Sequence, residues 1–561
     1  MSQTPEQQAE SAKEIRDAMR VVPQVAHGEP AVWLAGGALA MAVLIITGMV
    51  GLIVYQGGRA FWPDPIAKVR ASDGSEHLGE IQQVGSVPAD EANGGAKRVL
   101  LRSENFRWSG SHASWIVTDP NFEPTYPEWA VLVELMEEGR IIGQPTYFRV
   151  DGKVLESDPA SVWAAYNEHR GQISERTREI ERLTKGTLAK LTNRQADARL
   201  NARKAELEYG TDSAEHKQAL ADMDALLASL AKEQSDIDRK IADLEEINHR
   251  YEIGFLFQDG TEVFRPMADI NRMVPANRLT LVGRLGVYLD RWREFLTEDP
   301  RHANSQGGIW PALFGTVVMT MIMSIMVVPF GVLAALYLKE YAKPGFFVSL
   351  VRIAVNNLAG VPSIVFGVFG LSFFCYIVGA QIDEWFFTAS LPNPTFGKGG
   401  ILWASLTLAL LTLPVVIVAT EEALSAVPQS MREGSYGCGA TRWQTIQRVV
   451  LPRALPGIMT GMILAIARGA GEVAPLMLVG AVKMTQDLPI DLSQAPYLFP
   501  QRSFMHLGFH IYDLGFQSQD SEAARPMVFA TTLLLIGIVV GLNLGAIWLR
   551  ARLRRRFRAA R

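Results

Sequence analysis

Residues 431–452 read MREGSYGCGATRWQTIQRVVLP and stand between two apolar runs, residues 401–420 and 457–480. The pattern predicts a helix, a glycine turn, and then a short amphipathic helix that Pro452 ends before the chain re-enters the membrane. In this second helix Arg442 and Arg448 stay solvated, and the apolar contacts come from Trp443, Ile446, Val449 and Val450. The alternative is an interfacial helix that simply lies on lipid.

Apolar runs long enough to cross a bilayer occur six times in the chain. A hydrocarbon core of roughly 30 Å needs about 20 apolar residues of helix. The predicted spans are 31–55, 310–338, about 355–378, 401–420, 457–480 and 527–549. The third span is broken by Asn356, Asn357, Gly360 and Pro362. No small-residue cleavage site follows the first span, so we expect a retained anchor and a mainly α, polytopic membrane protein.

Charge separates these spans from one large insertion. Of the 112 charged residues in the chain, 72 lie in residues 63–305. This contrast excludes a uniform soluble globule, a wholly disordered chain and a pure membrane bundle. It predicts a membrane protein with one large water-exposed domain.

Positive charge is distributed unevenly over the short connections between spans. The connections that include residues 431–452 and the two termini carry seventeen Lys and Arg residues, whereas the opposite short loops carry Lys398, Lys483, Arg502 and Arg525. Because cytoplasmic loops are enriched in Lys and Arg, we expect two cytoplasmic tails, residues 1–30 and 550–561. The insertion 63–305 would then be periplasmic in a cell with two membranes.

The insertion is predicted to be an α+β domain with a long helical hairpin. Strand-like runs and turn residues indicate a β-rich base at 66–157 and 251–265, including a strand hairpin around Gly260. A helical block covers about 161–250, and Ser213 is expected to cap its second arm. Steps of three and four in that arm predict a coiled coil of Leu220, Met223, Leu227, Leu230, Ile237, Ile241 and Leu244. The hairpin is either a structural element or a docking arm for another protein.

Residues 281–296 form an amphipathic pattern typical of a helix on the membrane surface.

The spacing of residues 431–452 resembles the EAA loop of ABC importer permeases, written E-A-A-x3-G-x9-I-x-L-P. Glu433 takes the acidic position, Gly439 the glycine, Val449 the aliphatic position and Leu451-Pro452 the terminal pair. Gly434 and Ser435 replace the two alanines, and both are small but weaker helix formers. The resemblance implies that this EAA-like loop, residues 420–456, docks on a separate ATPase subunit through Glu433, Gly439, Ala440, Trp443, Leu451 and Pro452.

Three further segments resemble the PstA-type permeases of the phosphate-specific ABC importer, which are binding-protein-dependent transport inner-membrane components. They read GGIWPALFGT at 307–316, NLAGVPSIVFG at 357–367 and AIARGAGEVAPL at 465–476, so the resemblance covers a permease core at 306–549. It implies a transport subunit, not an enzyme, that carries inorganic phosphate across the inner membrane. The implied partners are a second homologous permease, an ATPase dimer and a periplasmic phosphate-binding protein, with no nucleic acid.

The chain itself offers no site for a nucleotide or a metal cofactor. It contains no G-x4-G-K-[ST] sequence, so we expect ATP and Mg²⁺ to bind to the partner ATPase and no cofactor to bind to this chain. His506 and His510 have the i,i+4 spacing of metal ligands without a carboxylate nearby, and we assign them no metal.

Arg468 and Glu472 are expected one helical turn apart inside the apolar fifth span. Ionisable groups at that depth are costly and commonly face a cavity or each other. Arginine donates paired hydrogen bonds to phosphate, and a carboxylate beside it would accept the proton of hydrogen phosphate, which sulfate lacks. The alternative is an ion pair that only neutralises itself.

Asn357 and Ser363 flank the interruption of the third span and complete the predicted substrate pathway. Broken helices in transporters direct backbone N–H groups at anions, although a kink that only improves packing is equally consistent with the sequence. Other functions also remain open: a permease for another oxyanion or small solute, or a membrane-anchored sensor with an external coiled coil.

Overall fold

Six helices in the described part of the chain are long and apolar enough to cross a membrane. They are Trp33–Arg59, Trp310–Tyr341, Ser363–Phe386, Ile401–Ser425, Arg442–Gly471 and Ala524–Arg552. The structure is a computed structural model that describes residues 30–86, 97–102, 113–119, 122–137, 139–257, 260–301, 304, 306–485, 487–491, 497–518 and 521–558. The mainly helical fold class and the number of spans are confirmed, although the third and fifth spans have other bounds than predicted. The chain divides into two compact units, residues 1–56 and 57–561, which we describe separately.

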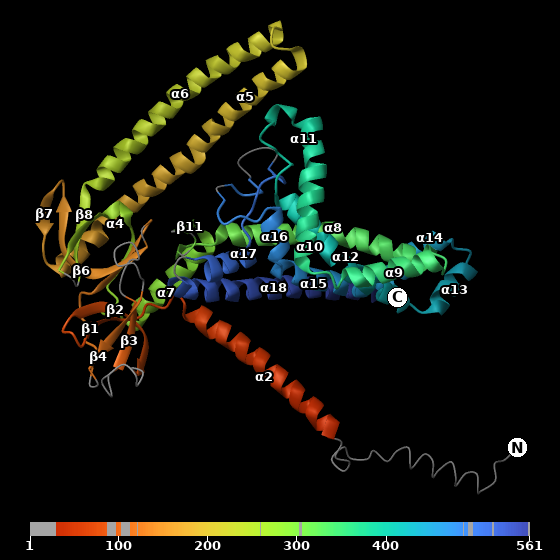
Figure 1. The fold of residues 1–561 in the computed structure, drawn as a ribbon, viewed down its shortest axis with the longest axis horizontal. Coiled ribbons are helices and arrows are strands. Elements are labelled where there is room, and N and C mark those ends of the chain that lie inside the picture. The colour runs from red at the N-terminus through yellow and green to blue at the C-terminus, as the bar shows by residue number, and fades with distance from the viewer. Residues whose placement is uncertain are drawn as a thin grey trace. The chain divides into compact units, whose positions relative to one another are not determined.

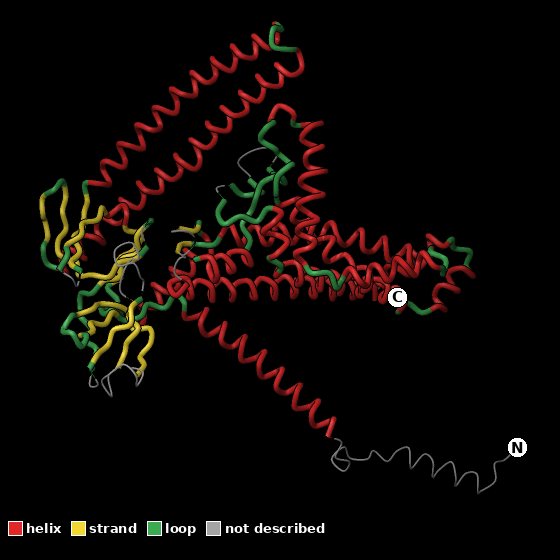
Figure 2. The backbone as a smooth tube through the Cα atoms, in the orientation of Figure 1, coloured by secondary structure: helices red, strands yellow, loops and turns green. Residues whose placement is uncertain are grey.

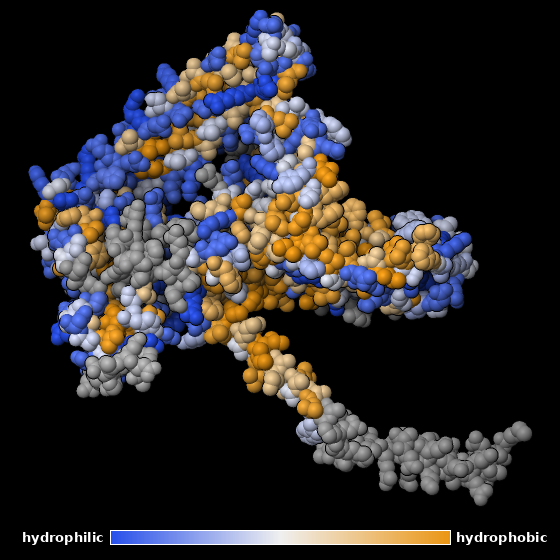
Figure 3. All heavy atoms as spheres, in the orientation of Figure 1, coloured by the Kyte–Doolittle hydropathy of each residue, from blue (hydrophilic) through white to orange (hydrophobic). Residues whose placement is uncertain are grey.

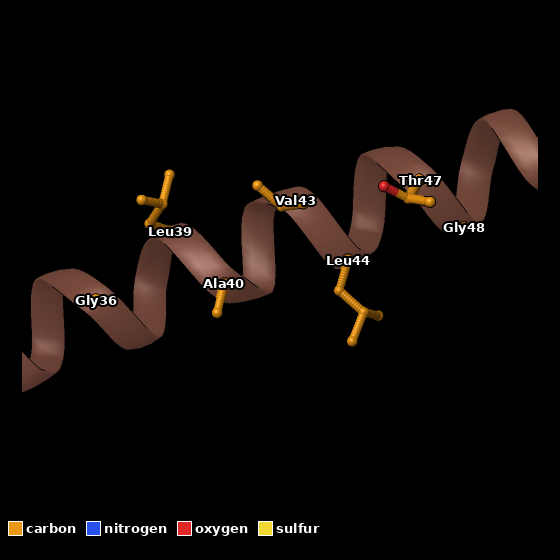
Figure 4. A pocket seen from close by; sticks show the side chains of 7 residues that line it. All are labelled: Gly36, Leu39, Ala40, Val43, Leu44, Thr47 and Gly48. Carbon is orange, nitrogen blue, oxygen red and sulfur yellow. The ribbon is translucent and has the colours of Figure 1, made fainter.

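The described residues of the first unit belong to α2 (Pro30–Arg59), the helix that contains the first span. Its large apolar side chains are exposed, for example Leu34 and Leu44. A shallow hollow on this surface is lined by residues of α2, which Figure 4 labels: Gly36, Leu39, Ala40, Val43, Leu44, Thr47 and Gly48. An apolar surface of this kind is suited to lipid or to another membrane helix.

In the second unit, four helices pack side by side as the core of the membrane part (Figure 1). They are α8 (Trp310–Leu336), α12 (Ile401–Ser425), α15 (Leu451–Gly471) and α18 (Ser521–Arg558). α12 packs against both α8 and α15. At Gly461 of α15 an added Cβ would lie 2.6 Å from the Cβ of Ala419, so small residues let α12 and α15 approach closely. Figure 3 shows apolar side chains gathered over this bundle.

The third span begins later than predicted. α9 (Phe346–Leu358) is a separate helix, and the span itself consists of α10 (Ser363–Phe369), the π-helix η4 (Gly370–Gly379) and α11 (Ala380–Phe386). The prediction of one span over 355–378 is therefore wrong. Pro362 has no N–H and disfavours a helical conformation in the residue before it, so the break falls ahead of the span and not within it.

The fifth span also departs from its predicted bounds. One helix runs from Arg442 to Gly471, through α14 (Arg442–Thr445), the π-helix η6 (Ile446–Val450) and α15. The prediction that Pro452 ends a short helix is wrong, because Pro452 falls at the first turn of α15, where the hydrogen-bond pattern changes and its missing N–H costs little. The helix ends at Gly471, before the predicted end at residue 480, and α16 (Ala474–Val479) follows separately.

Two antiparallel sheets form the β-rich part of the insertion (Figure 2). The first has the strand order β1-β2-β3-β4, and its strands are Ile66–Arg70, Glu76–Ser86, Lys97–Arg102 and Ser114–Thr118. The second has the order β10-β5-β6-β8-β9, with β7 also paired to β6; in chain order from β5 to β10 its strands are Val131–Leu135, Arg140–Val150, Lys153–Glu156, Tyr251–Leu256, Glu262–Pro266 and Ile270–Val274. The predicted hairpin around Gly260 pairs β8 with β9, whereas β10 lies beyond the predicted base. Gln258 and Asp259 of its turn lie outside the described residues.

The helical part of the insertion is a hairpin of two long arms. The first arm contains α4 (Pro159–Glu181), the π-helix η1 (Arg182–Leu188) and α5 (Ala189–Tyr209), and the second is α6 (Ala214–His249). Ser213 caps α6 as predicted, accepting a hydrogen bond from the His216 N–H. α5 packs against α6 and also contacts η5 (Thr388–Ser390), which follows the third span (Figure 1). The hairpin therefore reaches from the β-rich part to the membrane part of the molecule.

Candidate functional site

The EAA-like loop folds as two helices around a glycine turn. α13 (Gln429–Gly437) is followed by Gly439, whose φ of +80° favours glycine, and then by α14. Thr441 caps α14 in a capping box with Gln444. The helix–turn–helix order that the sequence predicts is therefore present, with Gly439 at the turn.

The loop is fixed to the helix bundle by apolar and ionic contacts. Ile446 and Val450 are 1% exposed and lie in one apolar cluster with Leu336 of α8 and Leu424 of α12. Ser435 on α13 is hydrogen-bonded to Thr445 on α14, with 2.9 Å between the two hydroxyl oxygens. These contacts set the orientation of the loop relative to the second and fourth spans.

A second anchor was not predicted from the sequence. Arg432 Nη1 lies 2.5 Å from Glu340 Oε1, in the π-helix η3 (Tyr337–Tyr341) that ends the second span. Arg432 Nη2 also donates to the Leu424 carbonyl at 2.7 Å. The sequence gives little indication of this pair, because Glu340 stands in a polar segment at the end of the second span, where a solvated side chain is expected.

Three of the six predicted coupling residues lie on the outer surface of the EAA-like loop. Glu433, Gly439 and Trp443 are exposed, whereas Ala440, Leu451 and Pro452 are half-buried. Of the residues predicted to supply apolar contacts, Ile446 and Val450 are buried, whereas the Trp443 side chain is 55% exposed. An exposed Trp on a fixed helix is a typical anchor for a protein partner.

Arg468 and Glu472 form the ion pair that their spacing predicts, with 3.7 Å between Arg468 Nε and Glu472 Oε1. Their side chains are 37% and 21% exposed, so the pair is accessible. The prediction that Glu472 lies inside a helix is wrong. Glu472 caps the C-terminus of α15 with an extended ψ of 136°. An added Cβ at Gly469 would lie 2.5 Å from Met323 Sδ, so α15 approaches α8 closely beside this pair.

The two other predicted pathway residues lie in different places. Ser363 begins α10, and α10 packs against α16, which starts two residues after Glu472. Asn357 is exposed near the end of α9, on the other side of the break. The structure therefore brings the element that starts at Ser363 near the end of α15, whereas Asn357 belongs to a separate helix.

Two histidines with metal-like spacing lie in or beside α17 (Leu507–Tyr512) and are buried. His506 caps that helix, and its Nδ1 accepts the Gly508 N–H at 3.1 Å. Neither ring nitrogen of His510 has a hydrogen-bond partner among the described residues. Within those residues, no group of three or more His, Cys, Asp or Glu side chains is arranged to hold a metal ion.

Comparison with known proteins places this architecture among transport proteins. The family described as binding-protein-dependent transport system inner membrane component matches residues 327–559. The phosphate transport system permease protein PstA of Mycobacterium leprae (strain TN) is 43% identical over 175 residues, 31% of this chain and 52% of that protein. The probable ABC transporter permease protein YqgI of Bacillus subtilis (strain 168) is 30% identical over 261 residues, 46% of this chain and 82% of that protein.

The chain spans about half the length of the PstA relatives it matches. Among solved structures, inward-facing conformations of the MetNI methionine ABC transporter match at 21% identity. That match covers 44% of this chain and 93% of the transporter chain, with a TM-score of 0.30.

Proposed function

The chain belongs to the family of binding-protein-dependent transport system inner membrane components, and on this premise we propose that it is the permease subunit of an ATP-driven importer of inorganic phosphate. The observation that carries this proposal is the 43% identity to a protein named as a phosphate transport permease. A permease for another oxyanion is the alternative. A membrane-anchored sensor is less favoured, since the matching family and the similar proteins are transport components.

The EAA-like loop would receive the movement of a separate ATPase subunit. Its exposed residues Glu433, Gly439 and Trp443 form the docking surface, together with the half-buried Ala440, Leu451 and Pro452. Arg432 and Glu340 would pass force to the second span. This chain would hold no cofactor, and ATP and Mg²⁺ would bind to the ATPase.

One continuous helix connects this docking surface to the ion pair of Arg468 and Glu472. Arg442–Gly471 spans 30 residues, which at about 1.5 Å per residue is roughly 45 Å. Because the helix is continuous, displacement of Trp443 would be passed along it toward Arg468. This arrangement supports a coupling path from ATP hydrolysis to the substrate pathway.

The pair offers the chemistry that hydrogen phosphate requires. The Arg468 guanidinium would donate paired hydrogen bonds to two phosphate oxygens, and the Glu472 carboxylate would accept the remaining phosphate proton. Sulfate has no proton at neutral pH and would leave that carboxylate facing an anion without a hydrogen bond. Ser363 and Asn357 remain proposed pathway residues, and the position of α10 near α16 favours Ser363.

Localisation and assembly follow from the same proposal. The chain would lie in the inner membrane with both termini in the cytoplasm and residues 63–305 in the periplasm, in agreement with the uneven distribution of Lys and Arg. Its partners would be a second homologous permease, an ATPase dimer and a periplasmic phosphate-binding protein.

Uptake of radiolabelled phosphate in cells that lack this gene tests the cargo. We expect high-affinity uptake to be lost in these cells and to be restored by the intact gene. The restored uptake should be insensitive to excess sulfate. Arg468→Ala should reduce uptake about tenfold or more and Arg468→Lys less, because lysine keeps the charge but not the fork. Lys232→Ala, on the exposed face of α6, is the matched control. Unchanged phosphate uptake in the deletion strain refutes the proposal that this chain transports phosphate. Normal uptake by Arg468→Ala at normal protein levels refutes a role of the Arg468–Glu472 pair in the substrate pathway.

A further inference from the structure

α7 (Leu281–Thr297) has an apolar stripe that none of the residues described by the structure covers. Leu281 is 77% exposed, Val282 80%, Leu285 48% and Leu289 58%. Residues at i, i+4 and i+8 lie along one face of a helix, so these side chains form a continuous surface. Exposed apolar stripes on soluble domains are uncommon and mark an interaction site.

The side of α7 next to the stripe is fixed by contacts with residues at the end of the first span and just after it. The ring of Phe61 lies 5.0 Å from that of Trp292 and 4.9 Å from that of Phe295. Arg291 donates to the Phe61 carbonyl at 3.1 Å, and the Tyr288 hydroxyl donates to the Gly58 carbonyl at 2.8 Å. The helix therefore cannot turn its stripe toward the membrane bundle without losing these contacts.

A buried ionic network fixes α7 to the β-rich part as well. Arg272 of β10 contacts Asp290 at 2.7 Å and Glu294 at 2.8 Å, both on α7. Arg291 of α7 lies 2.6 Å from Glu134 of β5. With both of its inner sides held, α7 presents the stripe outward.

The position of α7 relative to the membrane spans indicates what the stripe faces. Phe295 packs in one cluster with Ile309 and Ala312 at the start of α8, and with Ala524 and Met527 near the start of α18. α7 thus lies at the level where the second and sixth spans begin. Exposed aromatic residues stand at the same level: Trp310 is 38% exposed and Phe516 is 81% exposed. Aromatic side chains are enriched at the membrane–water interface.

We propose that α7 is a membrane-surface helix whose stripe of Leu281, Val282, Leu285 and Leu289 is immersed in the lipid leaflet on the side of the insertion. Arg293 continues the stripe by one turn and is exposed, so its guanidinium can reach the phosphate groups of the lipids. The immersed helix, held to the second sheet and to the membrane spans, would set the orientation of the insertion above the membrane. This inference is independent of what the chain transports.

Fluorescence quenching by spin-labelled lipids tests the proposal on the full chain. Cys375 and Cys438 are first replaced by Ala and Ser, and the protein carries an environment-sensitive fluorophore at Leu285→Cys or Leu289→Cys in phosphatidylethanolamine–phosphatidylglycerol vesicles. We expect a nitroxide near the headgroup to quench these probes about threefold or more above the level at Lys232→Cys on the exposed hairpin, because only an immersed helix approaches lipid. Ile325→Cys, in the middle of α8 and 69% exposed, should instead be quenched best by a nitroxide near the bilayer centre.

Two results overturn the proposal. Quenching at Leu285→Cys and Leu289→Cys equal to that at Lys232→Cys would place the stripe in water. A blue-shifted but unquenched fluorophore at both positions would show that protein, and not lipid, covers the stripe. The two cysteine positions are independent, and the quenching at Ile325→Cys verifies that each preparation is inserted and folded.

Discussion

Arg432 and Glu340 form an ion pair that is nearly removed from water, although each stands in a polar segment at the end of a helix. Their side chains are 12% and 6% exposed, with 2.5 Å between Nη1 and Oε1. Because Arg432 also donates to the Leu424 carbonyl, one side chain links α13 to the ends of the second and fourth spans. A load applied to the EAA-like loop would reach both spans through this residue.

Arg432→Ala should therefore destabilise the protein strongly. Removing one partner of a buried pair leaves the other charge uncompensated, at a cost of about 3–5 kcal/mol. Glu340→Gln combined with Arg432→Gln should cost less, since no unpaired charge remains. Thermal unfolding of the purified protein in lipid nanodiscs measures both. Arg352→Ala removes the more exposed pair with Glu421 and is the control, with an expected loss within about 1 kcal/mol. Equal losses from Arg432→Ala and Arg352→Ala would contradict the assigned role.

Gly439→Ala should impair coupling without any steric clash. The φ of Gly439 is +80°, a region that costs a residue with a Cβ about 1–2 kcal/mol, whereas an added Cβ would meet no atom within 4 Å. Gly439→Asn should be tolerated better, because asparagine enters this region more readily. The measurement is phosphate-dependent ATPase activity of the assembled importer. Gly437→Ala, in the open helical turn just before, is the matched control and should leave activity unchanged. Equal ATPase activities of Gly439→Ala and Gly437→Ala would show that the conformation of the turn at Gly439 is not needed for coupling.

The sequence predicted what depends on local pattern. Six apolar runs, the turn at Gly439 and the cap at Ser213 all follow from neighbouring residues, and the structure contains them. Partners distant in sequence were not predictable: nothing near Glu340 points to Arg432, 92 residues later. Helix ends were misplaced where signals competed. Pro452 suggested an end where the helix continues, whereas Gly471 and Pro475 were available signals that the helix stops before Glu472.

Glu134 should make the insertion sensitive to strong acid. Burial would raise the pKa of this carboxyl, but Arg291, Arg272 and Arg140 outweigh it and lower the pKa from 4.5 to about 2. A carboxyl with a lowered pKa stabilises the folded state above its unfolded pKa, and that contribution, roughly 3 kcal/mol, is lost as pH falls from about 4.5 to 2. Glu134→Gln should remove this dependence and lower stability at pH 7, because two buried arginines lose a partner. Acid unfolding followed by tryptophan fluorescence is the measurement, with Glu76→Gln as the surface control. An unchanged midpoint of acid unfolding in Glu134→Gln would show that Glu134 and its arginine partners do not cause the acid sensitivity.

His510 should produce a second loss of stability, at milder pH. Burial lowers the pKa of this imidazole from 6.5 to about 4, Asp513 opposes that shift and Lys483 adds to it. Between these two pH values the His510 ring is protonated in the unfolded chain but not in the folded chain. The stability of the folded state therefore decreases as pH falls from about 6.5 to 4, by an amount of the order of 3 kcal/mol. His510→Gln removes the titrating ring and should flatten the unfolding temperature over this window. His249→Gln, at an exposed position at the end of α6, should leave the profile unchanged. If His510→Gln keeps the full pH dependence, the loss originates elsewhere, and His506, whose pKa burial also lowers to about 4, is the next residue to replace.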